Sequence, residues 1–99
     1  MTAQPKAYWI ARVTITDPAA YAGYQSLAPQ AFAKYNCRFL ARGGETRICE
    51  GSIWERHVVI EFDSLADAYA CYDSEEYRAA RDQRQNACRA EVFIVEGIR

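Results

Sequence analysis

Residues 20–24 (AYAGY) and residues 68–72 (AYACY) repeat one pattern at equivalent points in the two halves of this 99-residue chain. Each copy lies just inside a segment whose apolar residues recur at helical spacing, and each segment follows a short apolar strand. A further strand-like stretch follows each helix. The sequence therefore predicts two strand–helix–strand units in tandem, with the element order β-α-β-β-α-β.

The first half begins with a predicted strand over Ala7–Ile15, in which one face is wholly apolar and the other carries Tyr8, Ile10, Arg12 and Thr14. Asp17 and Pro18 are typical of a helix start, because Asp accepts a bond from a free backbone amide and Pro suits the first helical position. Pro29 predicts a kink or a break in this helix. Asn36 is a plausible stop.

The first half ends with a short strand that is followed by a Gly43-Gly44 pair, which predicts a bulge or turn. Ser74 interrupts the later helical region and can cap a second helical segment. The remaining predicted elements are, in order, strands over residues 38–42, 46–50 and 57–62, helical segments over 65–72 and 75–87, and a strand over 91–96.

Right-handed connections between parallel strands limit how these elements can pair. Each half places its second strand inside the other half, which predicts a four-stranded antiparallel sheet in the order 4-1-3-2 with both helices on one face. This is the ferredoxin-like arrangement of an α+β protein. The length allows a single domain over residues 1–99.

One face of this sheet would be bare in a monomer. Five apolar side chains on it, at roughly 2 kcal/mol each, leave on the order of 10 kcal/mol of burial unrealised. A second copy packed sheet to sheet would recover that burial, so we expect a homodimer; the alternative is a monomer with a half-wet sheet. The expected uncovered residues are Ile10, Leu40, Val59 and either Phe93 and Val95 or Val92 and Ile94.

Composition excludes several classes of partner. Twelve basic and thirteen acidic residues give a net charge of −1, with no basic stripe for nucleic acid. No apolar run approaches the roughly 20 residues that cross a membrane, and no secretory segment precedes Lys6, so we expect a cytosolic protein. One histidine and four scattered cysteines do not supply a zinc site. We therefore expect no metal and no tightly held cofactor.

A set of short motifs follows in a fixed order along the chain, at residues 7–13, 16–18, 39–44, 50–51, 58–62, Ser64 and 72–77. Through these motifs nearly the whole chain resembles the bacterial family called domain of unknown function 1330. The resemblance implies a dimeric α/β barrel and no established reaction, within a superfamily that includes cofactor-free oxygenases, haem-degrading enzymes, lyases, isomerases and non-catalytic members. The chain departs from the family pattern at Asn36-Cys37 and at His57.

Three charged residues are predicted on the inner sheet face: Arg12, Arg42 and Glu61. A guanidinium beside a carboxylate could bind an acidic substrate or orient a general base. The alternative is an ion-paired cluster that ties two subunits together, because buried charges require pairing.

Further candidates for ligand binding lie elsewhere. Tyr72, Ser74 and Tyr77 cluster where the second helix breaks, and they either border a pocket or serve as cap and core. Arg84 either points into the cleft or lies on a solvated helix face. His57 could be a general base, or a residue near the surface at the start of a strand.

Two functions remain open. The first is a cofactor-independent enzyme that acts on a small organic acid by proton transfer or oxygenation; Arg42 would hold an anionic oxygen, Glu61 would move a proton and the tyrosines would shape the pocket. The second is a non-catalytic dimer that binds a small molecule or has a structural role. A raised pKa of Glu61 facing a cavity favours the enzyme; Glu61 paired to arginine favours the second function. The residues expected to line the enzyme's cleft are Arg42, Glu61, Tyr72, Ser74 and Tyr77.

Overall fold

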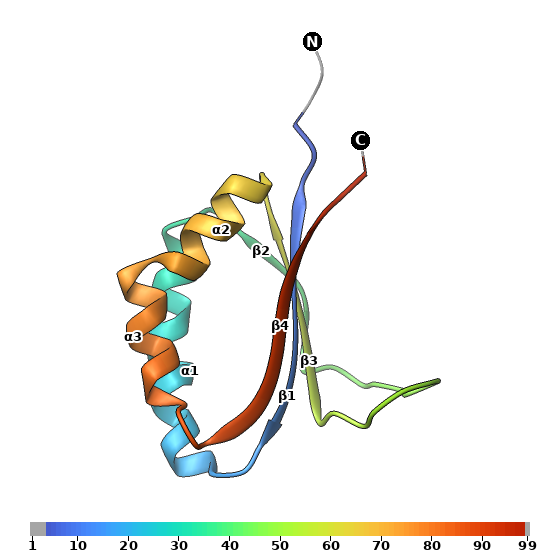
Figure 1. The fold of residues 1–99 in the computed structure, drawn as a ribbon, viewed down its shortest axis with the longest axis vertical. Coiled ribbons are helices and arrows are strands. Elements are labelled where there is room, and N and C mark those ends of the chain that lie inside the picture. Colours follow the sequence, from blue (N-terminus) through green and yellow to red (C-terminus); the bar gives the residue numbers. More distant parts are fainter. Residues whose placement is uncertain (1–3, 99) are drawn as a thin grey trace.

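The structure, a computed structural model, describes residues 4–98. Four strands form one antiparallel sheet in the order β2-β3-β1-β4, and the helices lie together on one of its faces (Figure 1). This confirms the predicted ferredoxin-like topology, whose order is the same when read from the other edge. The elements are β1 (Ala7–Ile15), α1 (Pro18–Ala33), β2 (Arg38–Arg42), β3 (Arg56–Phe62), α2 (Leu65–Asp73), α3 (Glu75–Gln83) and β4 (Cys88–Glu96).

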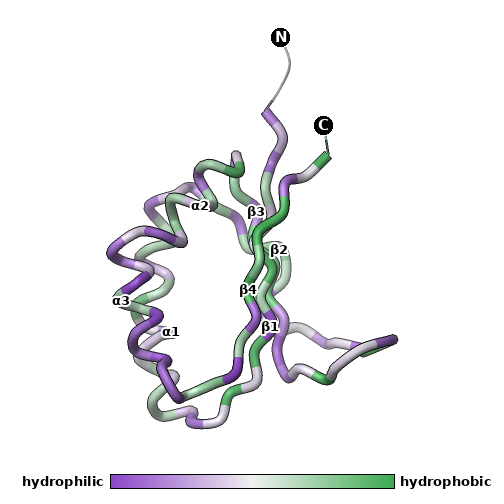
Figure 2. Tube along the Cα trace, viewed as in Figure 1, coloured by the Kyte–Doolittle hydropathy of each residue, from purple (hydrophilic) through white to green (hydrophobic). Residues whose placement is uncertain are grey.

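The core lies between the sheet and the helices and is built around Trp9 of β1. The Trp9 ring meets four aromatic rings, with centroids 4.9 to 6.0 Å away. Alternation along β1 buries every second side chain, as expected for a strand with one covered face. Figure 2 shows apolar residues concentrated along the strands, whereas α3 is largely hydrophilic. The rings around Trp9 belong to Phe32, Phe62, Tyr72 and Tyr77.

Helix α1 begins as predicted, with the Asp17 carboxylate accepting a hydrogen bond from the backbone amide of Ala20 at 3.2 Å. Of the two outcomes predicted at Pro29, a kink or a break, the break is wrong, because α1 continues through Pro29 as one helix. Ala28 and Phe32, on either side of Pro29, are both buried in the core, and this packing holds the helix together where one backbone bond is missing. Asn36 has a φ of 57°, the left-handed conformation typical of a residue after a helix end.

The predicted interruption of the second helical region is confirmed at Ser74, between α2 and α3. Helix α3 ends at Gln83 and β4 begins at Cys88, so the helix is shorter and the strand longer than predicted. The carbonyl of Ala87 accepts bonds from the amides of Thr16 and Asp17 at 2.9 and 3.0 Å. These bonds tie the turn before β4 to the end of β1, and pairing with β1 then extends to Cys88.

A bulge in β2 changes which face its last residues occupy. Phe39 pairs with Ile60 and Ala41 with Val59, so Leu40 is the extra residue. One extra residue reverses the alternation of side chains beyond it. Arg42 therefore lies opposite Val58, on the helix-covered face, and the prediction that Arg42 shares a face with Glu61 is wrong.

Residues 43–55 form a long connection between β2 and β3, which we call the arm. The predicted strand over residues 46–50 is wrong, because the arm has no regular secondary structure. It leaves the sheet on the side opposite the helices (Figure 1). None of the described helices is long and apolar enough to cross a bilayer.

Candidate functional site

A small cleft lies between α1 and the β2–β3 edge of the sheet, on the helix-covered face. Its volume is about 80 Å³. Its walls are mostly aromatic and apolar, and its polar groups come from two arginines, two tyrosines and one glutamine. The lining residues are Tyr21, Tyr24, Gln25, Ala28, Pro29, Phe32, Phe39, Arg42, Arg56 and Val58.

Arg42 and Arg56 reach this cleft from neighbouring strands. The bulge at Leu40 turns Arg42 towards the cleft, where its guanidinium lies 4.5 Å from the centre of the Phe39 ring. Within residues 4–98, neither guanidinium has a carboxylate at ion-pair distance. A guanidinium offers planar, paired donors that match a carboxylate, so two unpaired ones in a cleft favour an anionic ligand.

The tyrosines behind the arginines are protonated donors. The hydroxyls of Tyr24 and Tyr77 share a hydrogen bond of 2.9 Å, and the Arg84 guanidinium lies 4.7 Å from the centre of the Tyr24 ring. Burial raises the pKa of Tyr24 and of Tyr77, and it raises the pKa of Tyr21 to about 12. At neutral pH these groups therefore keep their protons, and the hydroxyls of Tyr21 and Tyr24, which line the cleft, can donate hydrogen bonds to an anion.

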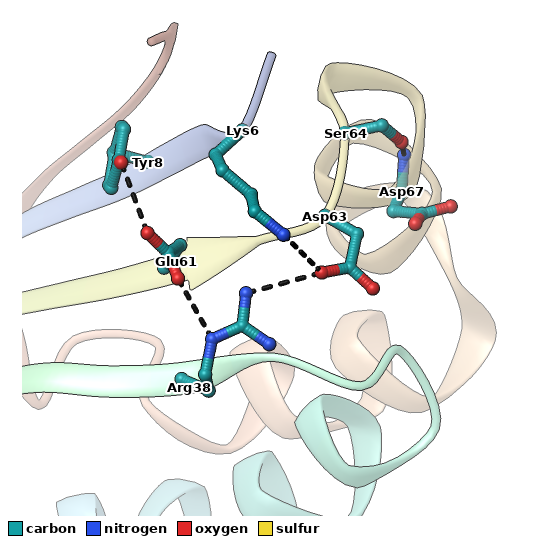
Figure 3. Close-up of polar contacts among 7 residues, drawn as sticks. All are labelled: Lys6, Tyr8, Arg38, Glu61, Asp63, Ser64 and Asp67. Carbon is teal, nitrogen blue, oxygen red and sulfur yellow. Dashed lines mark hydrogen bonds and ion pairs between the residues drawn. The ribbon is translucent and has the colours of Figure 1, made fainter. Parts of the chain in front are cut away.

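Glu61 belongs to a separate polar cluster on the open face of the sheet (Figure 3). Arg38 Nε donates to Glu61 Oε1 at 2.8 Å, and the Tyr8 hydroxyl donates to Glu61 Oε2 at 3.0 Å. Asp63 pairs with Arg38 Nη2 at 3.2 Å and with Lys6 Nζ at 3.1 Å. The bond from Arg38, followed by that from Tyr8, lowers the pKa of Glu61. Glu61 is thus an ionised, paired carboxylate.

The predicted cleft that joined Arg42 with Glu61 is therefore wrong, because the two side chains lie on opposite faces of the sheet. The arginine that pairs with Glu61 is Arg38, which lies opposite Glu61 on the neighbouring strand, and not Arg42. Arg12 does lie on the open face with Glu61, and its nearest carboxylate is Glu91 at 3.8 Å. The geometry of the open face matches the alternative interpretation, an ion-paired cluster.

The helix-break residues divide between a cap, the core and a separate pocket of about 340 Å³, which Tyr72 lines together with Asp73 and Phe93. Ser74 Oγ accepts from the Tyr77 amide at 3.1 Å and donates to the Cys71 carbonyl at 2.7 Å, so its hydroxyl is used by the helix ends. Tyr77 is fully buried and reaches the cleft only through its bond to Tyr24. Tyr72 packs on Trp9 with ring centroids 5.6 Å apart. Neither Ser74 nor Tyr72 lines the arginine cleft.

Arg84 and His57 also lie outside the cleft lining. Arg84 is half-buried against Tyr24, which places it in the layer behind the cleft and not on a solvated helix face. His57 on β3 lies opposite Arg12 on β1 in the strand register, and it borders a hollow under the arm. The predicted ligand-binding set is thus spread over the cleft, the helix break and the open face.

Sequence reasoning missed Arg56, Tyr24 and Gln25 as cleft residues. The sequence did contain a signal for Arg56. Every second residue of a strand lies on the same face, so Arg56 is on the face of Val58, Ile60 and Phe62, and the last two are buried. Tyr24 was assigned to the core by its helical spacing alone. Its hydroxyl faces the Tyr77 hydroxyl from another helix, and no local pattern predicts that contact.

Comparisons with known proteins agree with this fold. The family model Domain of unknown function (DUF1330) matches residues 6–98. No curated protein matches the chain. RPA0582, a protein of unknown function from Rhodopseudomonas palustris, has a similar structure with a TM-score of 0.78 at 16% identity, covering 97% of this chain and 85% of that one.

Two further solved structures share the fold at low identity. SnoaB, a cofactor-independent oxygenase from Streptomyces nogalater, gives a TM-score of 0.66 at 9% identity over 96% of this chain and 95% of that one. A dimeric ferredoxin-like protein of unknown function from Bacteroides fragilis gives 0.62 at 16% identity over 96% and 99%. At these identities the likeness is one of fold alone. The family match over nearly the whole length shows that the chain belongs to the DUF1330 family.

Proposed function

We propose that this chain forms a homodimer through its open sheet face and that each subunit binds a small organic anion in the cleft beside α1. The observation that carries the ligand proposal is the pair of unpaired guanidinium groups, Arg42 and Arg56, at one aromatic-walled cleft. Arg42 is exposed and Arg56 is half-buried, and the like charges of their guanidinium groups repel each other; an anionic ligand between them would relieve that repulsion.

The size and lining of the cleft narrow the ligand class. A volume of about 80 Å³ suits a small acid better than a nucleotide or a fatty acid. The guanidinium groups suit a carboxylate, and the rings of Phe32 and Phe39 suit a short apolar body. The proposed ligand is therefore a small carboxylic acid.

Surface area supports the homodimer. The chain exposes 6563 Å², whereas a compact monomer of this mass exposes about 5,700 Å². The excess of about 800 Å² equals one partner's share of a standard protein interface. The open face carries exposed Leu40, Phe93 and Val95, in line with the predicted uncovered set in its Phe93–Val95 form.

Calorimetric titration with a series of two- to six-carbon mono- and dicarboxylic acids tests the ligand proposal. We expect binding by the native protein and at least a tenfold weaker affinity in Arg42→Gln and in Arg56→Gln, because a hydrogen bond to a charged group contributes about 1.5–3 kcal/mol. Arg78→Gln, on the exposed surface of α3, is the matched control and should bind normally. Equal affinities in all four proteins would contradict the proposal.

A second candidate function is catalysis at the same cleft, by proton transfer or oxygenation of the bound acid without a cofactor. The Tyr24–Tyr77 hydroxyl pair behind the arginines favours it, because a protonated donor beside two cations would stabilise an enolate oxygen. Glu61 is not its base, because that carboxylate is paired on the other face.

Proton NMR of the bound acids in D₂O separates the two functions. An enzyme should exchange the proton next to the carboxylate, or consume dissolved oxygen, and Tyr24→Phe should slow that reaction while binding persists. Binding without exchange or oxygen uptake would favour the non-catalytic protein.

A further inference from the structure

The arm, residues 43–55, is fixed at its root and unsupported at its tip. At the root, Glu55 Oε1 accepts from the Ile15 amide at 3.0 Å, and the Gly43 amide donates to the His57 carbonyl at 2.9 Å. Within the described residues, the hydrogen bonds of the tip are local, such as Thr46 Oγ1 to the Gly44 carbonyl at 3.1 Å. Connections of this length without secondary structure are uncommon in compact domains and usually serve binding.

The arm and the open face enclose a hollow of about 570 Å³. Its floor is formed by Ile10, Arg12 and His57, and its side by Trp54 and the tip of the arm. Trp54 is only 8% exposed, and its Nε1 has no hydrogen-bond partner within the described residues; His57 Nδ1 is also buried without one. Buried polar atoms in native proteins are nearly always paired, so these two point to an absent partner.

The position of the arm restricts what that partner is. The arm projects from the same face that the proposed homodimer covers (Figure 1). Two copies packed sheet to sheet would meet each other's arms before their sheets were in contact. Ile53, next to the buried Trp54, is 82% exposed, so the arm presents an apolar side chain that a partner could cover.

We propose that the arm is an intersubunit clasp, lying against the partner subunit, and that the partner's chain fills the hollow beside Trp54 and His57. The occupant is a second copy of this chain, because the hollow is continuous with the open sheet face at Ile10 and Arg12, and the chain as a whole exposes an excess of about 800 Å², which matches one side of a dimer. Apolar and polar groups line it together, as in the core and rim of protein interfaces. The inference rests on the proposed homodimer.

Sedimentation equilibrium tests the clasp with variants of the full chain. Replacing residues 46–52 by Gly-Gly should raise the dimer dissociation constant at least 100-fold, and Ile53→Ser should raise it at least tenfold. Ile98→Ser, at a position 97% exposed outside the arm, is the matched control and should leave it unchanged. Circular dichroism should show the same secondary structure in all of them.

Isotope-filtered NMR on a dimer mixed from labelled and unlabelled chains tests the contact directly. We expect intermolecular NOEs from the methyl groups of Ile48 and Ile53 to the partner. A dimer whose arm shows only intrasubunit NOEs, and whose dissociation constant is unchanged in the shortened variant, would overturn the clasp and assign the hollow to a small ligand. A native protein that is monomeric at micromolar concentration would overturn both the clasp and the homodimer.

Discussion

The two faces of the sheet are made by the same strands, yet they differ in how completely the monomer uses them. On the helix face, Trp9, Ile60 and Phe62 are buried almost without exposure. On the open face, Phe93 and Val95 are 43% and 47% exposed beside paired charges. The helix face is thus completed within one chain, whereas the apolar part of the open face stays exposed and would be buried only in the proposed dimer.

The two faces also differ in whether their charged side chains are paired. On the open face, Glu61 and Asp63 are paired with Arg38 and Lys6, so this face presents no free charge at that end to a ligand. At the edge of the helix face, Arg42 and Arg56 have no carboxylate partner among residues 4–98. This difference is the basis for the proposal that one face serves assembly and the other binds an anion.

The largest expected effect is on the helix face. Trp9→Ala should lower the free energy of unfolding by about 3–5 kcal/mol, because it removes a ring in contact with four others and leaves a cavity. Urea denaturation should give this loss at every protein concentration. Phe93→Ala is the comparison on the open face, and its loss should grow with protein concentration, because only the dimer buries that side chain. Concentration-independent losses in both variants would remove the distinction between the faces.

A charge on the open face should separate the subunits. Phe93→Asp should weaken the dimer at least 100-fold in analytical ultracentrifugation, because a carboxylate would be buried in the interface without a partner. Tyr69→Asp on α2, at a position of similar exposure outside the sheet, should leave the dimer intact. Equal dissociation by both variants would indicate an interface through the helices.

Ser74→Ala sharpens the distinction between a cap and a ligand group. Loss of the bonds between α2 and α3 should lower the free energy of unfolding by about 1 kcal/mol, measured by thermal or urea unfolding. Affinity for the acid should not change, because Ser74 does not line the cleft. A tenfold loss of affinity would return Ser74 to the binding site.

The smallest effect concerns the pH dependence of the open-face cluster. Arg38 and Tyr8 lower the pKa of Glu61 below its usual 4.5, and Lys6, followed by Arg38, lowers that of Asp63. A carboxyl with a depressed pKa in the folded state stabilises it above the unfolded pKa and loses that contribution as pH falls through the folded pKa. Unfolding measured from pH 7 down to 3 should therefore show stability falling below about pH 4.5. Glu61→Gln should flatten this fall; an unchanged slope would show that Glu61 is not coupled to folding.

Local pattern was sufficient for the regular elements. The two-faced pattern of residues 7–15 predicted β1 with the bounds that the structure has, and Ser74 predicted the division between α2 and α3. The predicted strand over residues 46–50 was wrong because that stretch has no pairing partner in the sheet, which a local pattern does not reveal. The helix does not break at Pro29, since burial on both sides outweighed one missing backbone bond.

The amino-acid sequence by itself determined the topology, because apolar periodicity and helix caps are local properties that allow few ways to cover one sheet. The composition of the site was decided by the tertiary structure. One extra residue at Leu40 sends Arg42 to the cleft and leaves Arg38 with Glu61. Such a bulge depends on pairing with β3, a strand that follows 13 residues of arm. The face of the sheet on which a side chain lies depends on how two strands pair, and the sequence of one strand alone does not encode that pairing.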